Sequence, residues 1–123
     1  MEFRYNPSFQ PPAPMLRVGI SAPQGQGVIQ LQALIDTGSD ISILPESVIE
    51  GLGIIRAGTV ELEGYDGETT EATAFIVRVS LLTGRQWSVA VVAWSQSHGL
   101  IGRNLLNHWR LTLDGPKGIV TIE

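Results

Sequence analysis

One stretch constrains this chain more than any other: residues 33–40, which read ALIDTGSD. Apolar residues run directly into Asp36, and a Thr-Gly turn follows at once. An ionised carboxylate at the end of a buried strand is costly unless hydrogen bonds or a partner charge compensate it. Two interpretations are open on these residues alone: an ordinary turn, since Asp and Gly are both turn residues, or a carboxylate kept there for proton transfer.

The residues before Asp36 alternate in the manner of a β-strand. Within residues 28–35, Ile29, Leu31, Ala33 and Ile35 fall on one face and two glutamines on the other. The chain has 14 Gly and 7 Pro among 123 residues and only 16% charged residues, which is typical of a turn-rich β domain. Similar patterns predict further strands over 16–20, 59–63, 68–82, 86–94, 111–113 and 119–122.

Turns and short helices separate these strands. Asp66-Gly67 predicts a hairpin between 59–63 and 68–82, because glycine accepts positive φ. A second hairpin is expected at residues 83–84. Residues 46–50, after a proline, predict one short helix. Apolar spacing after residue 104 predicts another, with Asn104 as its N-cap.

Composition excludes several kinds of site. The chain has no cysteine, so disulfides and thiolate sites are impossible. His98 and His108 are too far apart to suggest zinc, and we expect no metal, no cofactor and no chemistry from either histidine. A net charge of −4 disfavours a nucleic-acid partner. No window is long and apolar enough to span a bilayer, and the N-terminus lacks a signal core, so we expect a cytoplasmic protein or a soluble domain of a larger one.

The proline-rich N-terminus suggests a division of the chain. Residues 1–14 contain four prolines and are expected to form an arm or linker without packed structure of its own. Residues 15–123 are then the folded domain.

Two separated blocks resemble the retropepsin family, the single-domain aspartic proteases of retroviruses and their bacterial and cellular relatives. Residues 33–40 are similar to the catalytic loop of the family, and residues 99–106, GLIGRNLL, to its hydrophobic-hydrophobic-Gly motif and the following helix. A glycine-containing hairpin lies between them, in the position of the family's flap. The resemblance implies an all-β, closed β-barrel-like acid protease fold with one short C-terminal helix, functional as a C2 homodimer.

The resemblance assigns Asp36 as the catalytic residue of an aspartic endopeptidase. Hydrolysis needs an activated water and a proton for the leaving amine, and two adjacent carboxylates that share one proton supply both. This chain has a single Asp-Thr-Gly, so the second carboxylate must be Asp36 of an identical partner.

The neighbours of Asp36 are expected to support the catalytic loop. Thr37 resembles the family residue whose hydroxyl reaches the partner's loop, although a β-branched residue can also simply fill a strand end. Gly38 lets the backbone approach a substrate. Ser39 stands where some relatives carry Ala, and its hydroxyl is expected to donate to the Asp36 carboxylate. Asp40 and Arg103 look like an ion pair between this loop and the C-terminal helix, the alternative being two solvated charges; Asp40 is also expected to face the substrate.

The flap tip is assigned to Gly64, Tyr65, Asp66 and Gly67. A hairpin of this kind opens to admit a peptide and then excludes water. Tyr65 departs from the glycine-rich viral tip, and either packs over the dyad or is exposed. The three tryptophans, at positions 87, 94 and 109, are expected to be core or interface anchors.

Two functions follow from the sequence. The first is an endopeptidase acting on a peptide or protein substrate, with self-processing of a precursor through the 1–14 arm as an extension. The alternative is a dimerisation or peptide-binding module of the same fold with little or no hydrolysis. The intact Asp-Thr-Gly at residues 36–38 favours the enzyme, because a scaffold has no need of a buried carboxylate.

Overall fold

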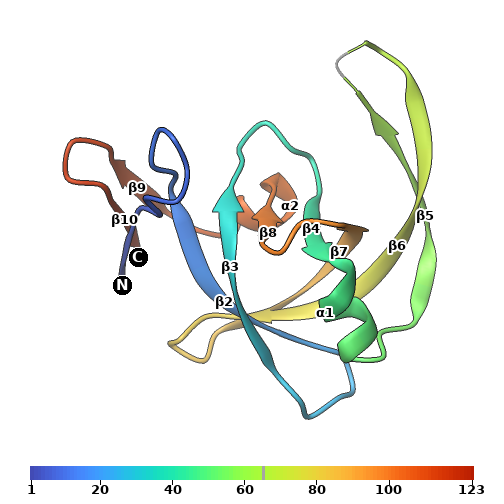
Figure 1. Ribbon diagram of the computed structural model, residues 1–123. Coiled ribbons are helices and arrows are strands. Elements are labelled where there is room, and N and C mark those ends of the chain that lie inside the picture. Colours follow the sequence, from blue (N-terminus) through green and yellow to red (C-terminus); the bar gives the residue numbers. More distant parts are fainter. Residues whose placement is uncertain (65) are drawn as a thin grey trace.

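A computed structural model describes residues 1–64 and 66–123 and shows a β-barrel with a small second sheet at one end (Figure 1). Within the described residues, the main sheet has seven strands in the order β2-β3-β8-β4-β7-β6-β5. Their bounds are β2 (Met15–Ser21), β3 (Ile29–Ile35), β4 (Ser42–Pro45), β5 (Arg56–Glu63), β6 (Thr69–Ser80), β7 (Gln86–Trp94) and β8 (Gly99–Ile101). The all-β, barrel-like fold expected from the sequence is therefore confirmed.

The sheet closes because β2 also pairs with β6. The register of this seam matches Gly19 with Ser80 and Ile20 with Val79. A Cβ atom on Gly19 would lie 2.6 Å from the Ser80 hydroxyl oxygen, so glycine permits the two strands to approach. Closure encloses a core of fully buried aliphatic side chains, which includes Val18, Ile20, Val77, Val79 and Val91.

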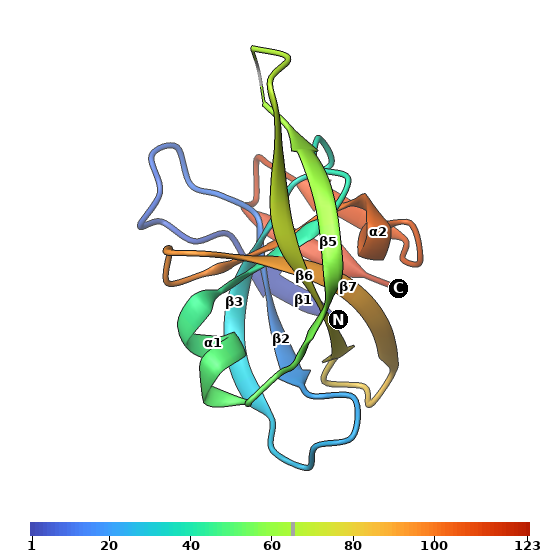
Figure 2. The ribbon, with the colours of Figure 1, turned by 90° about the vertical axis from the view of Figure 1, so that its right-hand side faces the viewer.

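The strand β6 belongs to two structures at once. Its first part, from Thr69 to Phe75, pairs with β5 to form a long hairpin, which we call the flap after its expected role, while its second part pairs with β7 and β2 in the barrel. Figure 2 shows this hairpin rising well above the barrel. The flap is thus a continuation of barrel strands beyond the core.

The chain ends form the second sheet. Its order is β1-β10-β9, with β1 (Glu2–Arg4), β9 (Leu111–Asp114) and β10 (Ile119–Ile122). The amide of Ile122 donates to the carbonyl of Met1 over 2.9 Å, and the Phe3 side chain packs against the core. The expectation that residues 1–14 lack packed structure is therefore wrong for residues 2–4, whose partner strand lies more than a hundred residues later in the sequence.

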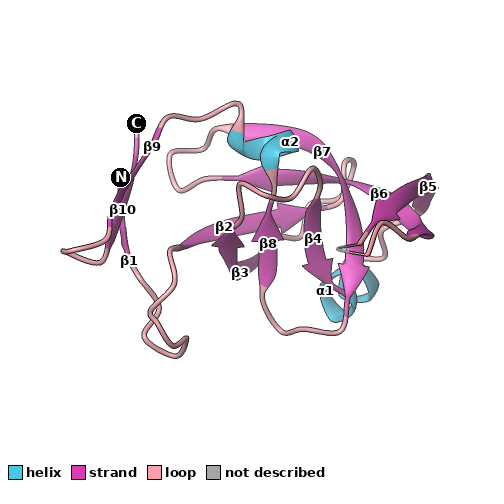
Figure 3. Cartoon of the chain, turned by 90° about the horizontal axis from the view of Figure 1, so that it is seen from above, coloured by secondary structure: helices cyan, strands magenta, loops and turns pink. Residues whose placement is uncertain are grey.

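Two short helices complete the described chain, α1 (Glu46–Gly51) and α2 (Arg103–Leu106). Neither is long and apolar enough to cross a membrane. Viewed from above, the sheet of the chain ends and the flap lie at opposite ends of the molecule, with α2 and the end of β3 between them (Figure 3). The loop that follows β3 therefore faces the space beside the flap (Figure 1).

Candidate active site

Asp36 is placed by the pairing of β3 with β8. The two strands run parallel, with Ala33 opposite Gly99 and Ile35 opposite Ile101. The ladder continues one step further, because the Asp36 amide donates to the Ile101 carbonyl over 3.0 Å. The backbone of Asp36 is therefore fixed by the barrel, while its side chain is only partly buried.

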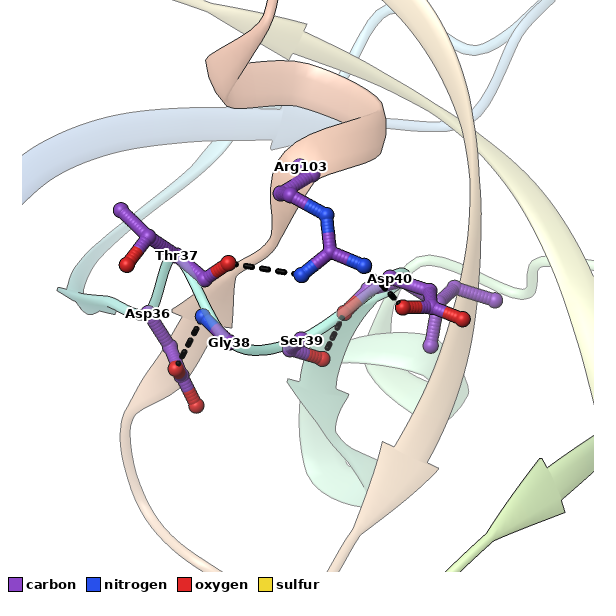
Figure 4. A network of polar contacts seen from close by, with 7 residues as sticks. Asp36, Thr37, Gly38, Ser39, Asp40 and Arg103 are labelled. Carbon is purple, nitrogen blue, oxygen red and sulfur yellow. Dashed lines mark hydrogen bonds and ion pairs between the residues drawn. The ribbon is translucent and has the colours of Figure 1, made fainter.

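A tight turn follows Asp36. The Gly38 amide donates to Asp36 Oδ1 over 2.9 Å, and the Ser39 amide to the Asp36 carbonyl over 3.2 Å. A Cβ atom on Gly38 would lie only 3.2 Å from Asp36 Oδ1. Glycine thus lets this amide approach the carboxylate and orient it (Figure 4).

The Ser39 hydroxyl does not reach the Asp36 carboxylate. It donates instead to the Ile41 carbonyl over 2.7 Å (Figure 4). A hydroxyl has a single proton to donate, so the expected hydrogen bond from Ser39 to Asp36 is wrong. Ser39 therefore supports the loop by a hydrogen bond to the backbone two residues later, at Ile41.

The start of α2 packs against residues 36–42, which we call the catalytic loop after their expected role. The amide of Arg103 donates to the Ser39 carbonyl over 2.8 Å, and that of Asn104 to the Asp40 carbonyl over 3.2 Å. A helix start has amides without helical partners, and here the loop carbonyls satisfy them. A Cβ atom on Gly102 would lie 2.4 Å from the Ile41 carbonyl oxygen, so this close contact requires glycine.

Ser42 and Asn104 form a connection that the sequence analysis missed. The Ser42 hydroxyl, which belongs to a residue only 1% exposed, accepts from the Gly102 amide over 3.0 Å and donates to Asn104 Oδ1 over 2.9 Å. Asn104 Nδ2 donates to the Ala90 carbonyl over 2.8 Å. Asn104 is therefore not the N-cap of α2, which is Gly102. The sequence signal for this connection was Ser42 itself, a single polar residue within the apolar run that follows the turn.

The Arg103 side chain connects two residues of the catalytic loop, Thr37 and Asp40. Its Nη1 donates to the Thr37 carbonyl over 2.7 Å, and its Nη2 forms an ion pair with Asp40 Oδ1 (Figure 4). The two side chains are 44% and 88% exposed, so the pair contributes well under the 3–5 kcal/mol of a buried pair, about 1 kcal/mol at most. The Thr37 side chain itself remains exposed.

The flap tip is held by hydrogen bonds within the hairpin. The Gly64 amide donates to the Glu68 carbonyl over 2.9 Å, and the Gly67 amide to the Gly64 carbonyl over 3.1 Å. Asp66 Oδ1 accepts from the Glu68 amide over 3.0 Å, and Gly67 has a φ of 80°. Tyr65, for which packing over the dyad and exposure were both left open, lies outside the described residues.

A groove of about 660 Å³ separates the catalytic loop from the flap. Its lining combines residues from both sides, so the structure brings Asp36 together with one arm of the hairpin. The lining consists of Asp36, Gly38, Ser39, Asp40, Ile41 and Asn104 on one side and residues 60–64 on the other. Within the described chain, no cluster of three or more histidine, aspartate or glutamate side chains suits a metal ion.

The tryptophans and His98 lie away from this groove. Trp87 and Trp109 pack edge to face, with ring centroids 5.3 Å apart, and both residues are partly buried. Trp94 packs against His98 in the same manner and donates its Nε1 proton to the His98 carbonyl over 2.7 Å. These aromatic rings therefore serve packing in the single chain.

Comparison with known proteins agrees with this geometry. The family model described as gag-polyprotein putative aspartyl protease matches residues 24–108, which contain the catalytic loop, the flap and α2. No curated protein matches the sequence at a significant level.

Several solved structures share the fold. EIAV protease complexed with the inhibitor HBY-793 has 22% identity and a TM-score of 0.58, over 78% of this chain and 86% of that one. The simian foamy virus (mac) protease has 19% identity and a TM-score of 0.56, over 76% and 92%. A retropepsin-like aspartic protease from Rickettsia conorii has 15% identity and a TM-score of 0.66, over 99% and 88%.

The family match spans more than half of the chain, and the structural likeness extends through the barrel and the flap. The chain has a retropepsin-like fold and belongs to the gag-polyprotein aspartyl protease family.

Proposed function

We propose that the protein is an aspartic endopeptidase whose active centre contains Asp36 from each of two identical chains. The observation that carries the proposal is the position of the Asp36 carboxylate, held by the Gly38 amide at a groove of about 660 Å³. Within one chain, the neighbouring carboxylate of Asp40 is turned away from Asp36 toward Arg103 (Figure 4). A second copy, related by a two-fold axis, would supply the missing acid.

The chemistry uses one proton shared by the two carboxylates. The ionised carboxylate accepts a proton from a water molecule as the water oxygen attacks the peptide carbonyl carbon. The protonated carboxyl group donates its proton to the carbonyl oxygen of the substrate. Collapse of the tetrahedral intermediate then breaks the C–N bond, and the leaving amine receives a proton from the carboxyl group that took up the proton of the water. The exposed Thr37 side chain would contact the partner's loop, and the flap would close over the substrate.

The test is hydrolysis of a denatured protein by wild type and by Asp36→Asn. The substitution keeps the side-chain shape but removes the proton-transfer group, so we expect activity to fall by at least about a thousandfold. Circular dichroism and thermal melting serve as folding controls. Equal cleavage by the two proteins would refute the catalytic role, and no cleavage by concentrated wild type would favour the peptide-binding module instead.

Dimer formation gives a second, independent measurement. Specific activity should fall on dilution, in step with the loss of dimer mass measured by analytical ultracentrifugation, because the monomer has one carboxylate of the pair. Activity that stays constant while the mass falls to that of a monomer would contradict the two-chain centre.

Self-processing is a further part of the proposal. A cut within residues 1–14 requires that segment to enter an active centre in extended form. Strand β1 would first have to leave β10, so we expect cleavage near residues 2–4 to be slower in the folded protein than in a denatured one.

A further inference from the structure

The flap carries an unusual excess of negative charge. Residues 56–75, which form this hairpin, contain one basic residue, Arg56, and five acidic residues: Glu61, Glu63, Asp66, Glu68 and Glu71. The net charge of these residues is therefore −4, which equals the net charge of the whole chain. All five side chains belong to exposed residues.

This charge is not neutralised within the chain. Glu61 lies directly opposite Glu71 in the β5–β6 pairing, and like charges in opposed positions destabilise a strand pair. The ion pairs found among the described residues join Arg103 to Asp40 and Arg110 to Glu123, and neither includes a flap carboxylate. The hairpin therefore maintains a repulsion that an external cation would relieve.

The flap charge adjoins the groove of the active site. Glu61 and Glu63 lie on one face of β5 and are among the residues that line the groove, together with Val60 and Leu62 from the other face. The catalytic loop contributes Asp36 to the same groove, and also Asp40, whose charge is offset by its ion pair with Arg103. Walls with one sign of charge concentrate the electric field within a cleft, which raises the local concentration of ligands of opposite sign.

We propose that the groove selects cationic peptide segments, with lysine or arginine side chains on either side of the scissile bond, and that the flap carboxylates of Glu61, Glu63 and Glu71 produce this selection. The inference rests on the proposed function and names its substrate class. Strand-like backbone contacts would hold a peptide of any sequence, whereas the carboxylates would discriminate by charge. Glutamate-rich segments would be repelled by the same groups.

The test uses peptides that share an apolar centre and carry lysine, glutamine or glutamate on both sides of it. We expect kcat/KM to be about tenfold or more higher for the lysine peptide than for the glutamate peptide at low salt. The ratio should decrease as ionic strength rises, because the screening length falls from about 10 Å at 0.1 M salt to about 3 Å at 1 M. Equal kcat/KM values for the lysine and glutamate peptides, with the glutamine peptide cleaved, would overturn the inference while the proposed function stands.

Variants assign the preference to the flap. In the triple variant Glu61→Gln/Glu63→Gln/Glu71→Gln, the ratio between lysine and glutamate peptides should fall several-fold toward one. The matched control is Glu46→Gln/Glu50→Gln, which removes exposed carboxylates from α1, outside the groove. Its ratio should equal that of wild type. A ratio that falls equally in both variants would show an effect of net charge and would contradict a role for the flap.

Binding separates this inference from the proposed function. Asp36→Asn is mixed with the fluorescently labelled lysine or glutamate peptide, and fluorescence anisotropy reports each Kd. Tighter binding of the lysine peptide, lost in the triple variant, supports the charge preference even if wild type cleaves nothing. Equal affinities for the lysine and glutamate peptides, both with and without the triple substitution, would refute the charge preference.

Discussion

The catalytic loop and the flap border one groove, yet their hydrogen bonds reach very different partners. Residues 36–42 bond to β8 through Ile101 and to α2 through Gly102 and Arg103. The described residues of the flap tip, by contrast, bond to one another within the hairpin. Contacts between distant parts of the sequence fix the carboxylate, and local contacts leave the hairpin free to move as a unit. The proposed site would thus combine a carboxylate fixed by long-range contacts with a hairpin tip fixed only by local ones.

Gly102→Ala is expected to give the largest effect among the tests of this comparison. The new Cβ would lie 2.4 Å from the Ile41 carbonyl oxygen, so either α2 or the catalytic loop must shift. We expect the free energy of unfolding, measured by denaturant titration, to fall by about 1–3 kcal/mol, with loss of proteolysis. The control is Gly58→Ala in the flap arm, where a Cβ meets no atom within 4 Å. Similar stabilities for the two variants would mean that the loop is not rigidly seated.

Ser42→Ala tests the buried link beneath the loop. Loss of the hydroxyl leaves the Gly102 amide without its acceptor and the Asn104 side chain without one donor. We expect about 1–3 kcal/mol of destabilisation, because buried polar groups without partners lose their solvation. Ser88→Ala, at an exposed position of β7, is the matched control and should change stability very little. An equal effect of both substitutions would argue against the link.

Arg103→Ala should have a smaller effect on stability than either of these. The arginine contacts the Thr37 carbonyl and Asp40, but both charged side chains are solvent-accessible. We expect at most about 1 kcal/mol of lost stability, together with weaker dimerisation measured by sedimentation. Arg110→Ala removes the other exposed ion pair and is the control. A melting temperature and a dimer affinity equal to those of wild type in Arg103→Ala would show that Arg103 does not support the loop.

Gly67→Ala is expected to leave the barrel unchanged. Gly67 has a φ of 80°, which an alanine adopts at a cost of about 1 kcal/mol. Because the tip is bonded locally, the strain should loosen the hairpin, so that hydrogen exchange speeds up at Gly64 while the Arg103 amide stays protected. Gly84→Ala, with a φ of 88° in a turn outside the groove, should leave Gly64 exchange as in wild type. Faster exchange at Arg103 in Gly67→Ala would show that the flap and the loop are coupled.

The sequence predicted the parts of this site that depend on local patterns. The alternation of residues 28–35 gave β3, and Asp66-Gly67 gave the turn of the flap. Similarity to the retropepsin family then supplied the barrel that joins them, which the family match and the solved structures confirm. Short-range periodicity is the signal that a single sequence carries best.

Long-range contacts explain the predictions that failed. Asn104 resembled an N-cap, because asparagine before an apolar helical run is common there, but its side chain bonds to Ser42 and Ala90 instead. The Ser39 hydroxyl bonds to the Ile41 carbonyl, whose direction depends on how the loop meets α2. No local pattern encodes which of several nearby acceptors the fold will present.

The pairing of β1 with β10 has a consequence for protein synthesis. A nascent chain leaves the ribosome from its N-terminus, so residues 2–4 emerge long before residues 119–122, with which they pair. Until the last strand is translated, Phe3 has no sheet to join. Pairing of the first strand therefore waits until residues 119–122 have been synthesised, and truncation before residue 119 would leave this strand without its partner.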